Sequence, residues 1–130
     1  MDMEATLARD VEATLAAPLA AVFDHLAAPE RLGDWLIAVM GVAADGTGHP
    51  DIGAEFALTL RADGVAVAAT GDVVAYEPPW QVAYRLCVGP RQHVVRITCA
   101  AHDGGTRVRV AQGGRGRPLA VAVTGLTPAR

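Results

Sequence analysis

The fold class can be predicted from residues 71–110, which read GDVVAYEPPWQVAYRLCVGPRQHVVRITCAAHDGGTRVRV. Within them, three runs mix apolar and polar residues in near alternation, at 82–88, 92–101 and 106–111, and short turn signals containing Gly or Pro separate the runs. Alternation with a period of two is typical of half-buried strands. Short, regular spacing favours antiparallel neighbours over parallel crossover units. These residues therefore predict an antiparallel meander.

The same pattern extends in both directions from this stretch. Upstream, strands are expected at 56–61 and 65–76 with a turn at 62–64, after a loop over 41–53 that is rich in Gly and Asp. Before the loop, the spacing of apolar residues predicts a strand over 5–15 and short helices over 18–27 and 29–38, with Pro18 and Pro29 at the helix starts. Downstream, glycines 113, 114 and 116 predict a flexible link to a short helix over 118–126. The expected fold is α+β, with a sheet of six or seven strands.

Composition excludes several kinds of active site. The 130 residues contain no Lys, no Ser and no Asn, which excludes a serine nucleophile, a Schiff-base lysine and a Walker-type phosphate loop. The length predicts one domain over residues 1–130. No apolar run is long enough to span a membrane, and the acidic start argues against a secretory signal. We expect a cytoplasmic protein, and the Ala-, Gly-, Val- and Arg-rich composition suggests a bacterial source.

Metal and nucleic-acid chemistry have little support in the sequence. Cys87 and Cys99 lack the C-x-x-C spacing of zinc and redox sites, and the four His residues form no i, i+4 pair. We expect no metal, and no disulfide, because the two cysteines are predicted on opposite faces of the sheet. The net charge of −3 argues against a nucleic-acid binder.

Strand alternation assigns side chains to an inner face of the sheet. A four-residue loop between the strands 82–88 and 92–101 would pair Val88 with His93 and Tyr84 with Ile97. We predict that the inner face is a ligand pocket, with small residues at 69 and 71 leaving room, because an apolar surface with few polar groups is typical of such pockets. The expected ligand-binding residues are Trp35 at the rim and Phe56, Leu58, Val73, Leu86, Val95, Thr106 and Val108, with Tyr84 and His93 as polar groups. A filled core without a cavity is the alternative.

The order of these elements resembles a known superfamily. The stretches VEATLAAPLAAVFDHLAAPERLGDWL (11–36), GDVVAYEPPWQVAYRL (71–86) and DGGTRVRV (103–110) are similar to segments of the helix-grip fold of the START and birch-pollen-allergen type, also called SRPBCC, in its polyketide cyclase/dehydrase-like branch. Members close with a long C-terminal helix. Here the nine residues 118–126 would span only about 13 Å, so either the cavity is unusually open, a partner covers it, or the chain is a shortened form. We expect incomplete covering within one chain.

The resemblance implies a protein that binds a hydrophobic, polyketide-like molecule and cyclises or dehydrates it without a cofactor. His93 would be the general base or acid, and Tyr84 would donate a hydrogen bond to a developing enolate oxygen. One alternative is a carrier of a lipid or apolar metabolite without catalysis, and another is a chaperone-associated interaction domain, since such domains share this fold.

Charge is unevenly distributed along the chain. Residues 85–130 contain eight Arg and one acid, and residues 1–84 contain three Arg and 13 acids. Either the two sets neighbour each other across the sheet and cancel, or the basic set docks an acidic partner such as an acyl carrier protein. The short terminal segment also favours a homodimer that covers exposed apolar surface.

Overall fold

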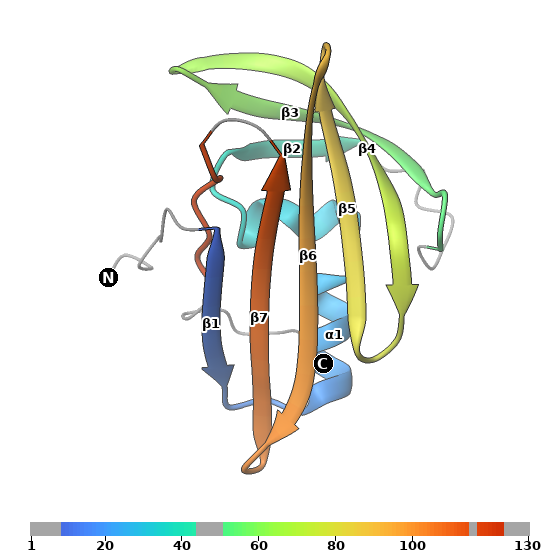
Figure 1. Ribbon diagram of the computed structural model, residues 1–130, viewed down its shortest axis with the longest axis vertical. Coiled ribbons are helices and arrows are strands. Elements are labelled where there is room, and N and C mark those ends of the chain that lie inside the picture. The colour runs from blue at the N-terminus through green and yellow to red at the C-terminus, as the bar shows by residue number, and fades with distance from the viewer. Residues whose placement is uncertain (1–8, 44–50, 115–116, 124–130) are drawn as a thin grey trace.

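A computed structural model describes residues 9–43, 51–114 and 117–123, and it has a curved antiparallel sheet of seven strands (Figure 1). Their order across the sheet is β1-β7-β6-β5-β4-β3-β2. The strands are β1 (Asp10–Leu15), β2 (Val39–Ala43), β3 (Glu55–Ala62), β4 (Val65–Glu77), β5 (Gln81–Val88), β6 (Arg91–His102) and β7 (Gly105–Gly114). The predicted antiparallel meander is confirmed. Residues 5–8 of the first predicted strand and 44–50 of the predicted loop lie outside the described residues.

Two Asp-Gly turns join long strands. Asp63-Gly64 and Asp103-Gly104 have positive φ at both central residues, which is the pattern of a type I′ hairpin turn. Between β5 and β6, Gly89 (φ 57°) and Pro90 form a two-residue turn, and Val88 pairs with Arg91. The predicted four-residue loop is therefore wrong, because a glycine with positive φ permits the tighter turn. Tyr84 pairs with Val95 and not with Ile97, but a shift of two residues leaves every side chain on its predicted face.

Two short helical elements lie behind the sheet (Figure 1). The α-helix α1 (Leu19–Leu26) matches the predicted helix over 18–27 and buries Val22, Phe23 and Leu26. The predicted helix over 29–38 is wrong in type and length, since η1 is a 3₁₀ helix of six residues, Pro29–Asp34. Gly33 and Asp34 are weak helix formers, and 3₁₀ helices are seldom longer. No helix among the described residues is long and apolar enough to cross a membrane.

One strand and one extended segment replace predicted loop and helix. Residues 39–43, where the predicted loop begins, form the edge strand β2, which pairs with β3. The predicted helix over 118–126 is wrong in its described part, because residues 117–123 form no helix. We call residues 117–123 the strap. Its Val121 forms an antiparallel bridge with Leu36, so backbone pairing with residues 35–37 holds it in an extended form.

The last strand is longer than its sequence indicates. β7 continues to Gly114, which pairs with His93, so residues 112–114 are not the predicted flexible link. The neighbouring strand β6 offers backbone N–H and C=O groups along this length, and the backbone groups of glycine can pair with them. The extension brings Gln112 onto the inner face, where it is buried.

The inner face carries the core of the molecule. Every second residue of β3 from Phe56 to Leu60 is buried, as are Ala69 and Val73 on β4, which confirms their predicted face. Val65, which alternation along β4 places on the same face, is 61% exposed because it lies at the β3–β4 turn. A register shift in β4 between Val73 and Ala75 marks a bulge, a feature that bends a strand and increases its twist.

The room predicted at Gly71 is occupied by an aromatic ring. Gly71 pairs with Phe56, and the Phe56 ring lies where a β-carbon on residue 71 would stand. Phe56 in turn contacts Tyr84 edge to face, with ring centroids 6.1 Å apart.

Replacing Gly71 with Ala should therefore push the Phe56 ring out of its site. Overpacking of this kind costs about 1–3 kcal/mol of unfolding free energy, which urea denaturation would measure. In a Phe56→Leu background the same substitution should cost less, since the ring is absent. Equal costs in both backgrounds would contradict the contact.

Candidate ligand site on the inner sheet face

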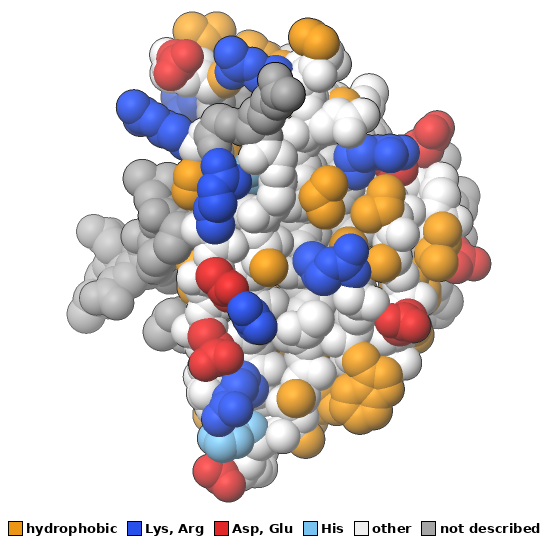
Figure 2. Space-filling view, viewed as in Figure 1, with side chains coloured by type: hydrophobic (Ala, Val, Ile, Leu, Met, Phe, Trp, Pro, Cys, Tyr) orange, Lys and Arg blue, Asp and Glu red, His pale blue; other side chains and the backbone are white. Residues whose placement is uncertain are grey.

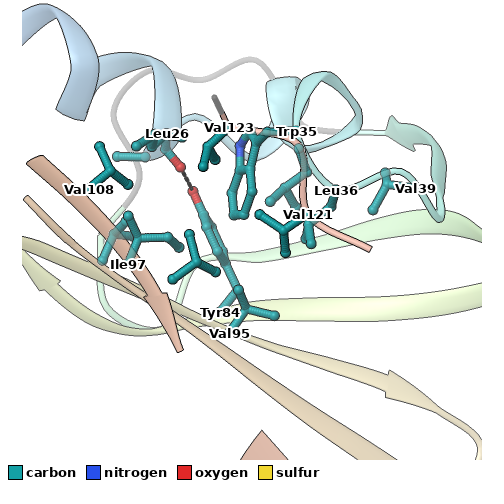
Figure 3. Packing of buried hydrophobic residues seen from close by; sticks show 14 of the residues in the cluster. Leu26, Trp35, Leu36, Val39, Tyr84, Val95, Ile97, Val108, Val121 and Val123 are labelled. Carbon is teal, nitrogen blue, oxygen red and sulfur yellow. Dashed lines mark hydrogen bonds between the residues drawn. The ribbon is translucent and has the colours of Figure 1, made fainter. Parts of the chain in front are cut away.

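The inner face is a continuous apolar surface under a thin cover. Its buried side chains come from β3 to β7, and α1, η1 and the strap lie over them (Figures 1 and 3). The predicted ligand-binding residues Phe56, Leu58, Val73, Leu86, Val95, Thr106 and Val108 are all buried on it. They pack against the cover, so the site is a closed apolar layer between sheet and cover.

Tyr84 joins the sheet to the end of α1. Its side chain is fully buried, and its hydroxyl donates a hydrogen bond of 2.7 Å to the carbonyl oxygen of Leu26 (Figure 3). The last carbonyls of a helix lack partners within the helix, so this bond satisfies a group that burial would otherwise leave unpaired. Burial raises the pKa of Tyr84 well above its ordinary value, so the hydroxyl keeps its proton at neutral pH.

His93 contacts the strap through Gln112. The Nε2–H of His93 donates to Oε1 of Gln112 at 2.7 Å. The same Oε1 accepts the backbone N–H of Leu119 at 2.8 Å, and Nε2 of Gln112 donates to the Leu119 carbonyl at 2.9 Å. This pattern assigns the Nε2–H tautomer to a neutral His93. His93 is half-buried and pairs across strands with Leu86, while Tyr84 pairs with Val95. The hydroxyl of Tyr84 thus bonds directly to the cover at α1, whereas Nε2 of His93 bonds to β7 and reaches the strap only through Gln112.

Gln112 is a functional candidate that the sequence interpretation missed. It lies two residues beyond Val110 on the inward side of β7, at a position treated as the start of a glycine-rich link. Extending the alternation of 106–110 by one more step would have placed it on the inner face. A buried amide on an apolar face needs partners for both its ends, and here the strap backbone supplies them.

Trp35 lies inside the core and not at the rim as predicted. It is 0% exposed, and its backbone carbonyl accepts the N–H of Ala122 in the strap at 2.8 Å. The indole Nε1–H is buried and has no hydrogen-bond partner among the residues that the structure describes. Tryptophan N–H groups usually have a hydrogen-bond partner when buried, so this group is an unsatisfied donor in an apolar layer.

Thr106 connects the sheet to the start of α1, and His25 connects α1 to η1. The Thr106 hydroxyl donates to the carbonyl of Ala17, just before α1, at 2.8 Å. His25 on α1 is buried, accepts a hydrogen bond from Arg31 at Nδ1 (3.0 Å) and donates from Nε2 to Asp34 (2.9 Å). The second cluster was not predicted, because His25 is an isolated histidine in the sequence. Both contacts explain how short helices stay in place over the sheet.

The outer face carries charge pairs. Arg85 donates to both carboxylate oxygens of Asp72. Arg109 likewise donates to both carboxylate oxygens of Asp10, and these bonds lower the pKa of Asp10. Figure 2 shows acidic and basic side chains interspersed on this side. These pairs agree with the predicted cancellation of charge across strands. A hollow of about 630 Å³ also lies on this side, lined mainly by outward side chains of β3 to β5 around Asp72 and Arg85. The described residues contain no cluster of three or more His, Cys, Asp or Glu that could hold a metal ion.

The two cysteines should react differently with alkylating reagents. Cys87 is half-buried on the outer face, and Cys99 is buried on the inner face, where desolvation raises its pKa to about 12. Because the thiolate is the nucleophile, iodoacetamide at pH 8 should modify Cys87 alone, and Cys99 only after denaturation. Intact-mass measurement of the native protein and of a Cys87→Ala control would show this. Rapid modification of the folded control would contradict the burial of Cys99.

Comparison with known proteins places these features in a family. A family profile described as polyketide cyclase/dehydrase and lipid transport matches residues 8–129. No curated protein was found to match the sequence.

Solved structures show the same fold. Protein DR_A0006 of Deinococcus radiodurans has a TM-score of 0.65 at 17% identity, covering 82% of this chain and 80% of that one. CalU16 of Micromonospora echinospora has a TM-score of 0.57 at 19% identity, covering 94% of this chain and 72% of that one. Ara h 8.0201 has a TM-score of 0.59 at 16% identity, covering 93% and 80%.

Proposed function

The chain belongs to the polyketide cyclase/dehydrase and lipid transport family, and from this premise we propose that it binds a hydrophobic small molecule, a lipid or a polyketide-like compound, on the inner face of its sheet. The observation that carries the proposal is the unbroken apolar layer between β3–β7 and a cover of two short helical elements and an extended strap. Burial of apolar ligand surface supplies the main driving force for such binding.

Fluorescence titration with 8-anilinonaphthalene-1-sulfonate tests the proposal. Adjacent residues of β4 provide a matched pair, because Ala69 is buried on the inner face and Ala68 is exposed on the outer face. Ala69→Leu adds three carbon atoms between sheet and cover and should weaken probe binding several-fold, whereas Ala68→Leu should leave it unchanged. Near-UV circular dichroism would confirm that each variant is folded. Absence of binding, or equal binding by both variants, would contradict the proposed site.

Cyclisation or dehydration of the bound molecule is the second candidate, and the family description is the observation that favours it. His93 is the proposed general base, because its Nε2–H is committed to Gln112 and Nδ1 keeps a lone pair. Tyr84 is the proposed hydrogen-bond donor to a developing enolate oxygen, for which its hydroxyl would exchange the Leu26 carbonyl for the substrate.

His93→Phe separates an enzyme from a carrier. If the protein is a cyclase, turnover should fall roughly 100-fold or more while ligand affinity changes little. Native mass spectrometry of the purified protein would identify a co-purified ligand, and the assay then follows from that compound. Unchanged turnover in the variant would remove His93 from the mechanism, and absence of turnover by the unaltered protein would favour a carrier. An acyl carrier protein as partner and a homodimer stay predictions, which light scattering with and without the carrier protein would test.

A further inference from the structure

The strap occupies part of the inner apolar layer. Its residues Val121, Ala122 and Val123 are each 1% exposed, so they are as buried as the core of the sheet. Figure 3 shows Val121 and Val123 next to the Trp35 indole, and the bond from Ala122 N–H to Trp35 O holds the strap against that residue. The strap thus fills apolar space with its own side chains.

Few bonds hold the strap in place. Its backbone bonds to residues 35–37 through Ile37 N–H to Ala120 O (3.1 Å) and Ala122 N–H to Trp35 O (2.8 Å). The Gln112 amide adds two bonds to Leu119. Each of these groups can bond to water instead, so the net stabilisation from each bond is small. Opening of the strap would therefore cost mainly the burial of its apolar side chains, which an apolar ligand in the same place would replace.

The strap also leaves one buried group unsatisfied. The strap places valine side chains beside Trp35, and these cannot accept a hydrogen bond. No described residue accepts a hydrogen bond from Nε1–H of Trp35. A buried donor without an acceptor is unfavourable, and the penalty disappears when an acceptor arrives. An apolar ligand with an acceptor oxygen would therefore gain a bond that the strap does not make.

We propose that the strap is an exchangeable occupant of the ligand site, and that the ligand which replaces it is an apolar molecule whose carbonyl or similar acceptor bonds to Nε1–H of Trp35. This inference rests on the proposed function and specifies its ligand. Trp35 then determines specificity, and Gln112 determines how readily the strap leaves.

A reversible disulfide tests the exchange. Leu36 and Val121 lie directly opposite each other, and the backbone hydrogen bonds are made by the residues on either side of them. They are therefore a non-hydrogen-bonded antiparallel pair, the kind with the shorter Cα–Cα distance. Their Cα atoms should therefore lie within disulfide range. In a Cys87→Ala background, the double variant Leu36→Cys/Val121→Cys should bind 9-fluorenone at least tenfold more weakly when oxidised than when reduced. The single variant Val121→Cys, treated identically, is the control. Equal affinity in both redox states would overturn the exchange.

A matched pair of probes tests the role of Trp35. Fluorene and 9-fluorenone share a tricyclic frame and differ at one carbon, which is a methylene in the first and a carbonyl in the second. In competition with 8-anilinonaphthalene-1-sulfonate, fluorenone should bind the unaltered protein about tenfold more tightly than fluorene. Trp35→Phe should remove most of that preference. Equal affinities in the unaltered protein, or an unchanged preference in the variant, would overturn the assignment, whereas failure of both probes to bind would overturn the proposed function with it.

Discussion

Tyr84→Ala should lower the free energy of unfolding by about 4 kcal/mol, and Tyr84→Phe by about 1–2 kcal/mol. The first substitution removes a fully buried ring and its edge-to-face contact with Phe56. The second keeps the ring but leaves the Leu26 carbonyl without its donor inside the core. Urea denaturation followed by far-UV circular dichroism would measure both losses, and the difference between them separates ring packing from the hydrogen bond.

Tyr76→Phe is the matched control for this pair. Tyr76 is a partly buried tyrosine that contacts Phe23, with ring centroids 5.9 Å apart. Its substitution keeps this contact and should change stability by no more than about 0.5 kcal/mol. A similarly small loss for Tyr84→Phe would mean that the bond to Leu26 contributes nothing, and α1 would then be held by apolar packing alone.

Gly105→Ala should cost about 3 kcal/mol, because the new methyl group would meet backbone and not a side chain. A β-carbon at position 105 falls on the carbonyl oxygen of Leu15, at the end of β1. A clashing side chain could rotate away from the methyl group, but a backbone carbonyl cannot. The backbone of Leu15 belongs to the β1–β7 ladder, and Leu15 is only 3% exposed. Either strand must shift, so pairing weakens at the edge of the sheet. Thermal and urea denaturation would both report the loss.

Gly41→Ala is the control for Gly105→Ala. Gly41 lies in β2, and nothing stands within 4 Å of the position its β-carbon would take. Since alanine restricts the unfolded chain more than glycine does, this variant should be as stable as the unaltered protein or slightly more stable. Equal losses at both positions would show that the cost comes from the strand backbone in general and not from the Leu15 contact.

The strands from Glu55 onward were predictable because local signals agree there. Alternation indicates the inner face, and the Asp-Gly pairs at 63–64 and 103–104 mark the turns. The edge strand β2 was not predictable in this way, since Val39–Ala43 shows no clear alternation and only Val39 is buried. It forms because β3 has an unpaired edge, and that edge depends on the tertiary structure and not on the local sequence.

The strap was missed for the same kind of reason. Residues 118–126 have a composition that suits a short helix, and the family pattern favours one, but the backbone of residues 35–37 provides partners for an extended chain. Pairing across more than 80 residues of sequence leaves no local signal, so propensity predicts the wrong element.

The sequence predicts on which face of the sheet the candidate side chains lie, but it does not predict their hydrogen-bond partners. Alternation places Tyr84 and His93 on the inner side, and the structure agrees. Their partners, the Leu26 carbonyl and the Gln112 amide, come from α1 and from the far end of β7. A hydrogen bond between distant segments depends on curvature and register together, and neither is encoded by any one stretch of chain.

The pairing of β1 with β7 has a consequence for synthesis on the ribosome. Asp10–Leu15 pairs with residues 106–111, so β1 must wait until residue 111 has been synthesised before it finds its neighbour. The hairpins from β3 to β7 can form one after another as each emerges, since each strand pairs with the next. During that interval the apolar side chains of β1 have no partner strand, and exposed apolar residues of this kind favour aggregation. Contacts this distant in sequence also predict slow folding, in milliseconds to seconds.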